Sequence, residues 1–112
     1  DLVVSRGGRF SAILQPVAYI GDPIAGDLKL NSPASEALAN QYETVYPLIR
    51  DLASQAGIDF LDLTRVFDGC SSCYSDFCHA TLDGHEILVG AMSPHLINRA
   101  KARKISSIER NE

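Results

Sequence analysis

Residues 52–63, LASQAGIDFLDL, decide the fold class, because they hold the end of a helix and a whole strand with a single glycine between them. The helix is expected to begin where Ser32 can cap the first turn and Pro33 can take the first helical position. Its apolar residues recur every three or four positions as far as Ala56. Gly57 then ends the helix, and the strand follows at once.

A second strand is predicted upstream of this helix. Residues 10–19 are rich in apolar and β-forming side chains, and turn signals at residues 7–8 and 21–23 bound them. With the strand at residues 58–63, the order is strand, helix, strand, which is the right-handed crossover unit of a parallel sheet. The fold class is therefore α/β. Residues 20–32 are expected to form a loop.

The last helix is predicted to begin with a capping box, in which Asp83 is the cap and Glu86 reaches back to it. An apolar stripe follows, and Pro94 is expected to kink this helix. In the first helix, Pro47 removes an amide donor, which predicts a kink or break near residues 43–46.

Size and charge exclude several classes of function. The chain has 112 residues and 46% hydrophobic residues, with no apolar run that approaches a membrane span of about 20 residues. A net charge of −4 disfavours nucleic acid as a partner. We divide the chain into a partial α/β domain at residues 1–100 and a basic C-terminal tail at residues 101–112.

A carboxylate and an imidazole lie three positions apart in the segment from Asp76 to His79. In hydrolases with a serine nucleophile, histidine takes the hydroxyl proton while a carboxylate holds the ring in one tautomer. The segment lies between the second strand and the last helix, and active sites of open α/β sheets gather beyond the carboxyl ends of strands. Asp76 and His79 are our candidate catalytic residues. The alternative is a turn-capping aspartate beside an unrelated histidine.

Asp76-x-x-His79, with Gly84 five residues later, resembles the last conserved block of the SGNH (GDSL-type) hydrolases, a family of serine esterases and lipases. The resemblance spans roughly residues 10–96, since both predicted strands resemble late core strands of that family. It implies the C-terminal portion of a flavodoxin-like three-layer α/β/α domain with a parallel sheet. It also implies hydrolysis of a small-molecule, carbohydrate or lipid acyl ester, with neither a cofactor nor a metal.

The family's nucleophile and oxyanion donors have no counterpart in this sequence. The chain contains no Gly-Asp-Ser block and no Gly-x-Asn-Asp block, and at residues 21–23 a proline stands where the serine would be. Ser71, Ser72 and Ser75 are near His79 in sequence, but none is predicted on a strand-to-helix elbow that would present its hydroxyl. We therefore interpret the chain as the C-terminal half of a hydrolase, and expect it to be inactive alone.

Three cysteines support a competing interpretation. Cys70, Cys73 and Cys78, together with His79 or His85, are four possible zinc ligands of a small metal-binding interaction module. A local disulfide, either Cys70 to Cys73 or Cys73 to Cys78, is favoured over the zinc site, and the third thiol is then unpaired or bonded to the missing portion of the domain. A further interpretation is an inactive or split SGNH-like partner, which would bind a complementary chain or form a homodimer through its unburied faces.

Overall fold

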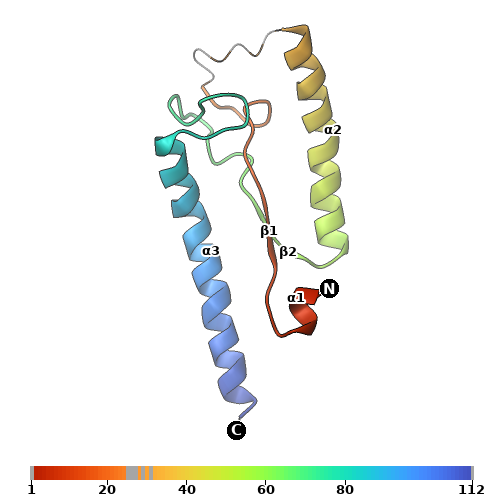
Figure 1. The fold of residues 1–112 in the computed structure, drawn as a ribbon, viewed down its shortest axis with the longest axis vertical. Helices are drawn as coiled ribbons and strands as arrows, with labels where there is room; N and C mark the ends of the chain where they lie inside the picture. Colours follow the sequence, from red (N-terminus) through yellow and green to blue (C-terminus); the bar gives the residue numbers. More distant parts are fainter. Residues whose placement is uncertain (1, 25–27, 29, 31, 112) are drawn as a thin grey trace.

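The computed structural model describes residues 2–24, 28, 30 and 32–111, and part of the predicted loop at residues 20–32 lies outside them. In this part of the chain the fold is mixed α/β (Figure 1). The elements, in chain order, are α1 (Leu2–Ser5), β1 (Ser11–Leu14), α2 (Pro33–Gln55), β2 (Asp59–Asp62) and α3 (Leu82–Glu109).

β1 and β2 form a parallel two-stranded sheet among the described residues, with Ser11 opposite Asp59 and Leu14 opposite Asp62. The predicted strand-helix-strand order is therefore confirmed. The first strand is shorter than predicted, because it ends at Leu14 rather than continuing to residue 19. Pro16 has no amide hydrogen for the ladder, and from there the chain turns into a loop.

The two faces of the sheet meet different helices. Side chains alternate along a strand, so Phe60 and Asp59 point to opposite faces of β2. Phe60 packs on the core of Leu14, Val17 and Tyr46, and Tyr46 comes from α2. Asp59 instead contacts side chains of α3. Figure 1 shows the same order, with α2 and α3 on opposite sides of the strand pair.

Helix α2 begins as predicted and continues past its proline. The Ser32 hydroxyl accepts a hydrogen bond from the Ser35 amide at 3.1 Å. The predicted break near residues 43–46 is wrong, because the helix is continuous through Pro47 to Gln55. Glu43 and Pro47 are both exposed, so water can solvate the carbonyl that loses its donor.

Helix α3 begins differently from the prediction. Thr81, not Asp83, is the cap: its hydroxyl accepts a hydrogen bond from the Gly84 amide at 3.2 Å, while Asp83 lies in the first turn. The Asp83 capping box is therefore wrong. The helix continues through Pro94 as far as Glu109, so residues 101–109 of the expected tail are helical. No described helix is long and apolar enough to cross a bilayer.

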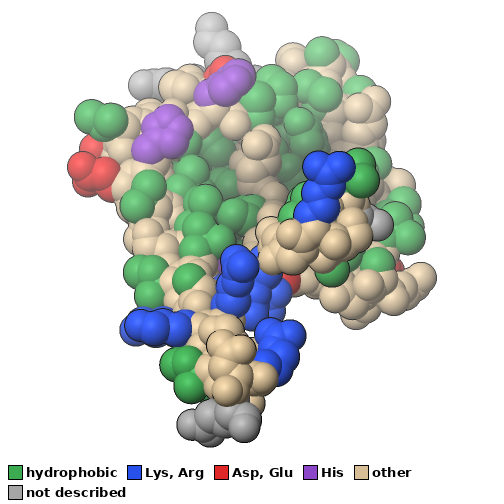
Figure 2. Space-filling view, turned by 60° about the horizontal axis from the view of Figure 1, so that its bottom comes forward, with side chains coloured by type: hydrophobic (Ala, Val, Ile, Leu, Met, Phe, Trp, Pro, Cys, Tyr) green, Lys and Arg blue, Asp and Glu red, His purple; other side chains and the backbone are tan. Residues whose placement is uncertain are grey.

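The molecule is elongated, with extents of 61 × 28 × 19 Å and a radius of gyration of 17.4 Å. Large apolar side chains stay exposed on both long helices, as on Leu48 and Leu52 of α2 and on Val89 and Ile97 of α3. Figure 2 shows hydrophobic side chains across the face between the helices, and Lys and Arg side chains gathered toward the C-terminal end of α3. Much apolar surface of the helices is thus left without cover.

Candidate active site

The segment from Tyr74 to Ala80 forms a small closed loop ahead of α3. Tyr74 and Ala80 pair as an isolated antiparallel bridge. Inside it, the amide and the hydroxyl of Ser75 both donate to the main-chain oxygen of His79, at 2.9 and 3.1 Å. The Ala18 amide donates to the Phe77 carbonyl at 2.8 Å, which joins this loop to the segment after β1. The loop therefore lies beyond the carboxyl end of β1.

Asp76 holds the ring of His79 within this loop. Its Oδ1 accepts from the amides of Cys78 and His79 at 2.9 and 2.8 Å, and its Oδ2 lies 2.7 Å from His79 Nδ1. The Cys78 amide, followed by the His79 ring and amide, holds the pKa of Asp76 well below its usual range. Asp76 is therefore ionised at neutral pH and can only accept hydrogen bonds.

The tautomer of His79 follows from this arrangement. Because the carboxylate can only accept, Nδ1 must carry the hydrogen that it donates to Asp76. In the neutral ring Nε2 then has a free lone pair, which is the state that a general base needs. The structure thus brings together the two residues that the sequence predicts as a pair.

Both side chains of the pair are open to solvent. The His79 side chain is 74% exposed and that of Asp76 is 50% exposed. Electrostatic catalysis is strongest where water is excluded, and among the described residues nothing shields this pair from water. The nearby Ser75 is not a nucleophile in this arrangement, since its hydroxyl donates to the main-chain oxygen of His79 and not to the ring.

An apolar pocket of about 320 Å³ adjoins Asp76. Its lining includes Tyr19, Phe77 and Leu38, and the Tyr19 and Phe77 rings lie 5.6 Å apart. Of the two aromatic residues that flank Asp76 in sequence, only Phe77 lines this pocket. The other, Tyr74, packs edge-on against Phe67 at 5.0 Å, and burial raises its pKa.

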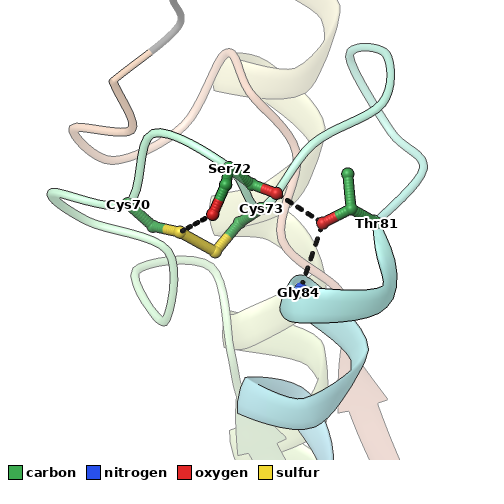
Figure 3. The surroundings of a disulfide bond; sticks show 5 residues. All are labelled: Cys70, Ser72, Cys73, Thr81 and Gly84. Atoms are coloured by element: carbon green, nitrogen blue, oxygen red, sulfur yellow. Dashed lines mark hydrogen bonds between the residues drawn. A yellow bond between two sulfur atoms is a disulfide. The ribbon is translucent and has the colours of Figure 1, made fainter.

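A disulfide stabilises the segment that precedes the site. Cys70 and Cys73 are joined, which is one of the two predicted pairings, and Cys78 is free. Figure 3 shows how Thr81 connects this segment to α3: its hydroxyl donates to the Ser72 carbonyl and accepts from the Gly84 amide. With both sulfur atoms in a disulfide, the predicted four-ligand zinc set of Cys70, Cys73, Cys78 and a histidine is not formed.

Cys78 lies between the core and the pair of Asp76 and His79. It packs against the core, and its Sγ is 3.6 Å from His79 Nδ1. Burial and then the negative charge of Asp76 raise the pKa of the Cys78 thiol, so it is protonated at neutral pH and is a poor nucleophile. Asp76, Cys78 and His79 nevertheless offer three ligand atoms that lie within 4.8 Å of one another.

A second polar cluster, which the sequence did not predict, lies at the opposite end of the strands. Asp59 Oδ2 accepts from the Ser11 hydroxyl and lies 3.2 Å from His95 Nε2 and 3.1 Å from Arg99 Nε. The Ser11 hydrogen bond, with help from His95 and Arg99, lowers the pKa of Asp59. The cluster links the sheet to α3. Its one signal in the sequence is the four-residue spacing of His95 and Arg99 on a helix.

Asp62, at the end of β2, links the sheet to α2. It accepts hydrogen bonds from Arg50 and from the hydroxyl and amide of Thr64. Burial alone would raise the pKa of Asp62, but the Thr64 and Arg50 contacts lower it overall. Asp59 and Asp62 thus join the sheet to α3 and α2, respectively.

Comparison of this chain with protein-family models, with curated proteins and with solved structures found no match.

Proposed function

We propose that this chain is the C-terminal part of a flavodoxin-like SGNH-type ester hydrolase, in which His79 is the general base and Asp76 is the residue that orients it. One observation carries the proposal. Asp76 Oδ2 lies 2.7 Å from His79 Nδ1, while two main-chain amides hold the other carboxylate oxygen. This arrangement fixes the ring in the tautomer whose Nε2 accepts a proton.

The proposed reaction is acyl transfer through a serine ester. A serine hydroxyl from another segment gives its proton to His79 Nε2 and attacks the ester carbonyl, and Asp76 stabilises the imidazolium that forms. His79 then returns the proton to the leaving alcohol. A water molecule then attacks the acyl-serine while the same nitrogen takes its proton, and His79 returns that proton to the serine oxygen as the acid leaves. The main-chain or amide donors that hold the oxyanion come from the segment that supplies the serine.

The pocket beside Asp76 is suited to an acyl group. Its wall of Tyr19, Phe77 and Leu38 is apolar, and each methylene buried there would contribute about 0.8 kcal/mol to binding. Because the pocket adjoins the carboxylate that orients the base, an acyl chain in it would place the ester carbonyl near His79. We propose a small-molecule, carbohydrate or lipid acyl ester as the substrate.

The test uses the protein encoded by the complete reading frame that contains these residues. We expect it to hydrolyse p-nitrophenyl butyrate and to react with a fluorophosphonate at one serine, while residues 1–112 alone do neither. His79→Ala should lower kcat at least about 10³-fold and abolish labelling. His85→Ala is the matched control, because His85 is exposed in the first turn of α3, outside the pair.

Asp76→Asn tests the orienting residue in the same protein. The amide keeps the size of the side chain but removes its charge, so we expect kcat to fall about 10⁴-fold while KM stays close to that of the parent. Asp83→Asn, an exposed acid nearby, should have no such effect. A reading frame without a Gly-Asp-Ser block, or full labelling of the His79→Ala variant, would contradict the proposal.

A further inference from the structure

We infer that Asp76, Cys78 and His79 form a binding site for a soft divalent cation such as Zn²⁺. Binding of the cation does not require that these residues also act in hydrolysis. The carboxylate oxygen, the thiol sulfur and the ring nitrogen all lie within 4.8 Å of one another. All three are ligand types that Zn²⁺ takes in proteins. This set differs from the four-ligand zinc set considered from the sequence, because it uses neither Cys70 nor Cys73.

The distance between the Cys78 sulfur and the His79 nitrogen fits tetrahedral coordination of one cation. With Zn–S near 2.3 Å and Zn–N near 2.05 Å, a tetrahedral angle separates sulfur and nitrogen by about 3.6 Å. Cys78 Sγ and His79 Nδ1 are 3.6 Å apart in the structure. The 2.7 Å between Nδ1 and Asp76 Oδ2 is a hydrogen-bond distance, and a metal would widen it to about 3.3 Å.

The surroundings leave room for that change. The Asp76 side chain is 50% exposed and that of His79 is 74% exposed, so both can shift toward solvent without disturbing the core. Water can take the fourth position. Cys78 packs against the core and would anchor the cation from the inner side.

Metal binding would rearrange the hydrogens of the site. The thiol releases one proton to solvent as Cys78 becomes a thiolate. The metal takes the Nδ1 lone pair, so the hydrogen that Nδ1 carried leaves it and the neutral ring carries its hydrogen on Nε2 instead. The charges of thiolate and carboxylate together then balance the dication.

This rearrangement would switch off a general base. A ring with its hydrogen on Nε2 has no lone pair to receive the proton of a hydroxyl, and the carboxylate no longer orients it. Inhibition by Zn²⁺, reversed by a chelator, therefore follows if the proposed function holds. The binding of the cation itself does not depend on that function.

The experiment is a titration of the 112-residue chain with Co²⁺ under non-reducing conditions, which keep the Cys70–Cys73 disulfide closed. We expect a thiolate-to-Co²⁺ charge-transfer band and strong visible bands of a tetrahedral ion, both removed by adding Zn²⁺. Cys78→Ser should abolish the charge-transfer band. His79→Ala and Asp76→Asn should each weaken binding at least about tenfold. Circular dichroism of each variant verifies that it is folded.

Two controls separate this site from other thiol chemistry. His85→Ala should leave the titration unchanged, and so should the double variant Cys70→Ser/Cys73→Ser, in which Cys78 is the one remaining cysteine. In ¹⁵N spectra of the His79 ring, Zn²⁺ should move the ring hydrogen from Nδ1 to Nε2.

The inference is wrong if the parent chain gives no thiolate band with excess Co²⁺, or if the band survives Cys78→Ser and is lost in the double variant. The two proposals fail separately. A complete protein without esterase activity whose chain still gives the Cys78-dependent band would reject only the hydrolase. An active esterase without that band would reject only the metal site.

Discussion

Gly84, in the first turn of α3, lies so close to the disulfide segment that a larger residue cannot fit. A Cβ at this position would be 2.4 Å from the Cys73 carbonyl oxygen and 3.1 Å from Phe67 Cζ. We expect Gly84→Ala to lower the free energy of unfolding by about 1–3 kcal/mol, because a backbone oxygen must move. Urea unfolding followed by circular dichroism measures the change.

Gly90 is the matched control on the same helix. A Cβ there would meet nothing within 4 Å. Gly90→Ala should therefore raise the free energy of unfolding by roughly 0.5–1 kcal/mol, the usual gain in helix propensity. If the two substitutions had equal effects, the close packing of Gly84 would not limit stability.

Single residues were predictable where their partners are close in sequence. Asp76 bonds to groups two and three positions later, a common pattern for aspartate in turns, so the pair could be found from its spacing. Asp59 meets Ser11 48 positions earlier and His95 36 positions later. Only the folded chain brings those three residues together, so no local sequence pattern predicts the contact.

At the scale of elements, Thr81 connects the disulfide segment to α3 through its hydroxyl. That oxygen accepts from the Gly84 amide, and its hydrogen goes to the Ser72 carbonyl. We expect Thr81→Ala to lower the free energy of unfolding by about 1–2 kcal/mol, measured by urea unfolding, since both contacts are lost. Asp83→Ala should lower the free energy of unfolding by less than Thr81→Ala does. If Asp83→Ala were the more destabilising of the two, Asp83 and not Thr81 would be the cap.

The two strands and the two long helices were predictable in type and order, and their ends less so, whereas the short helix α1 was not predicted. The apolar period and the Ser32 cap indicated α2, and the short apolar runs indicated β1 and β2. The expected break at Pro47 did not appear, because exposure to water makes one lost amide tolerable. Thr81 and Asp83 are both good caps, and only the contact with Ser72, nine residues away, favours the threonine.

At the scale of the whole molecule, the chain is more extended than a compact domain. A compact domain of this length would have a radius of gyration of about 13 Å, whereas this molecule has 17.4 Å. Large apolar side chains on both long helices are exposed in this extended shape, and no described segment covers them. From the sequence, the lack of Gly-Asp-Ser and Gly-x-Asn-Asp blocks predicted half of a domain, and with it unburied faces.

We therefore expect the isolated chain to self-associate. Burial of side chains such as Leu48, Leu52 and Val89 against a second copy removes apolar surface from water, at about 25 cal/mol per Å². Sedimentation velocity over a range of concentrations should show dimers or larger species. A compact monomer with one cooperative thermal transition would contradict this expectation, and also the interpretation of the chain as half of a domain.

The hydrogen bonds that join Ser75, Asp76, Cys78 and His79 to one another span at most four residues. Closing so short a circuit costs little chain entropy and takes far less time than docking distant segments. The Asp76 carboxylate and the His79 ring can therefore align early in folding, before segments that are distant in sequence have docked. Any later-arriving surface that carries a hydroxyl would meet an acceptor already aimed outward, so assembly of the complete site would need only one docking event.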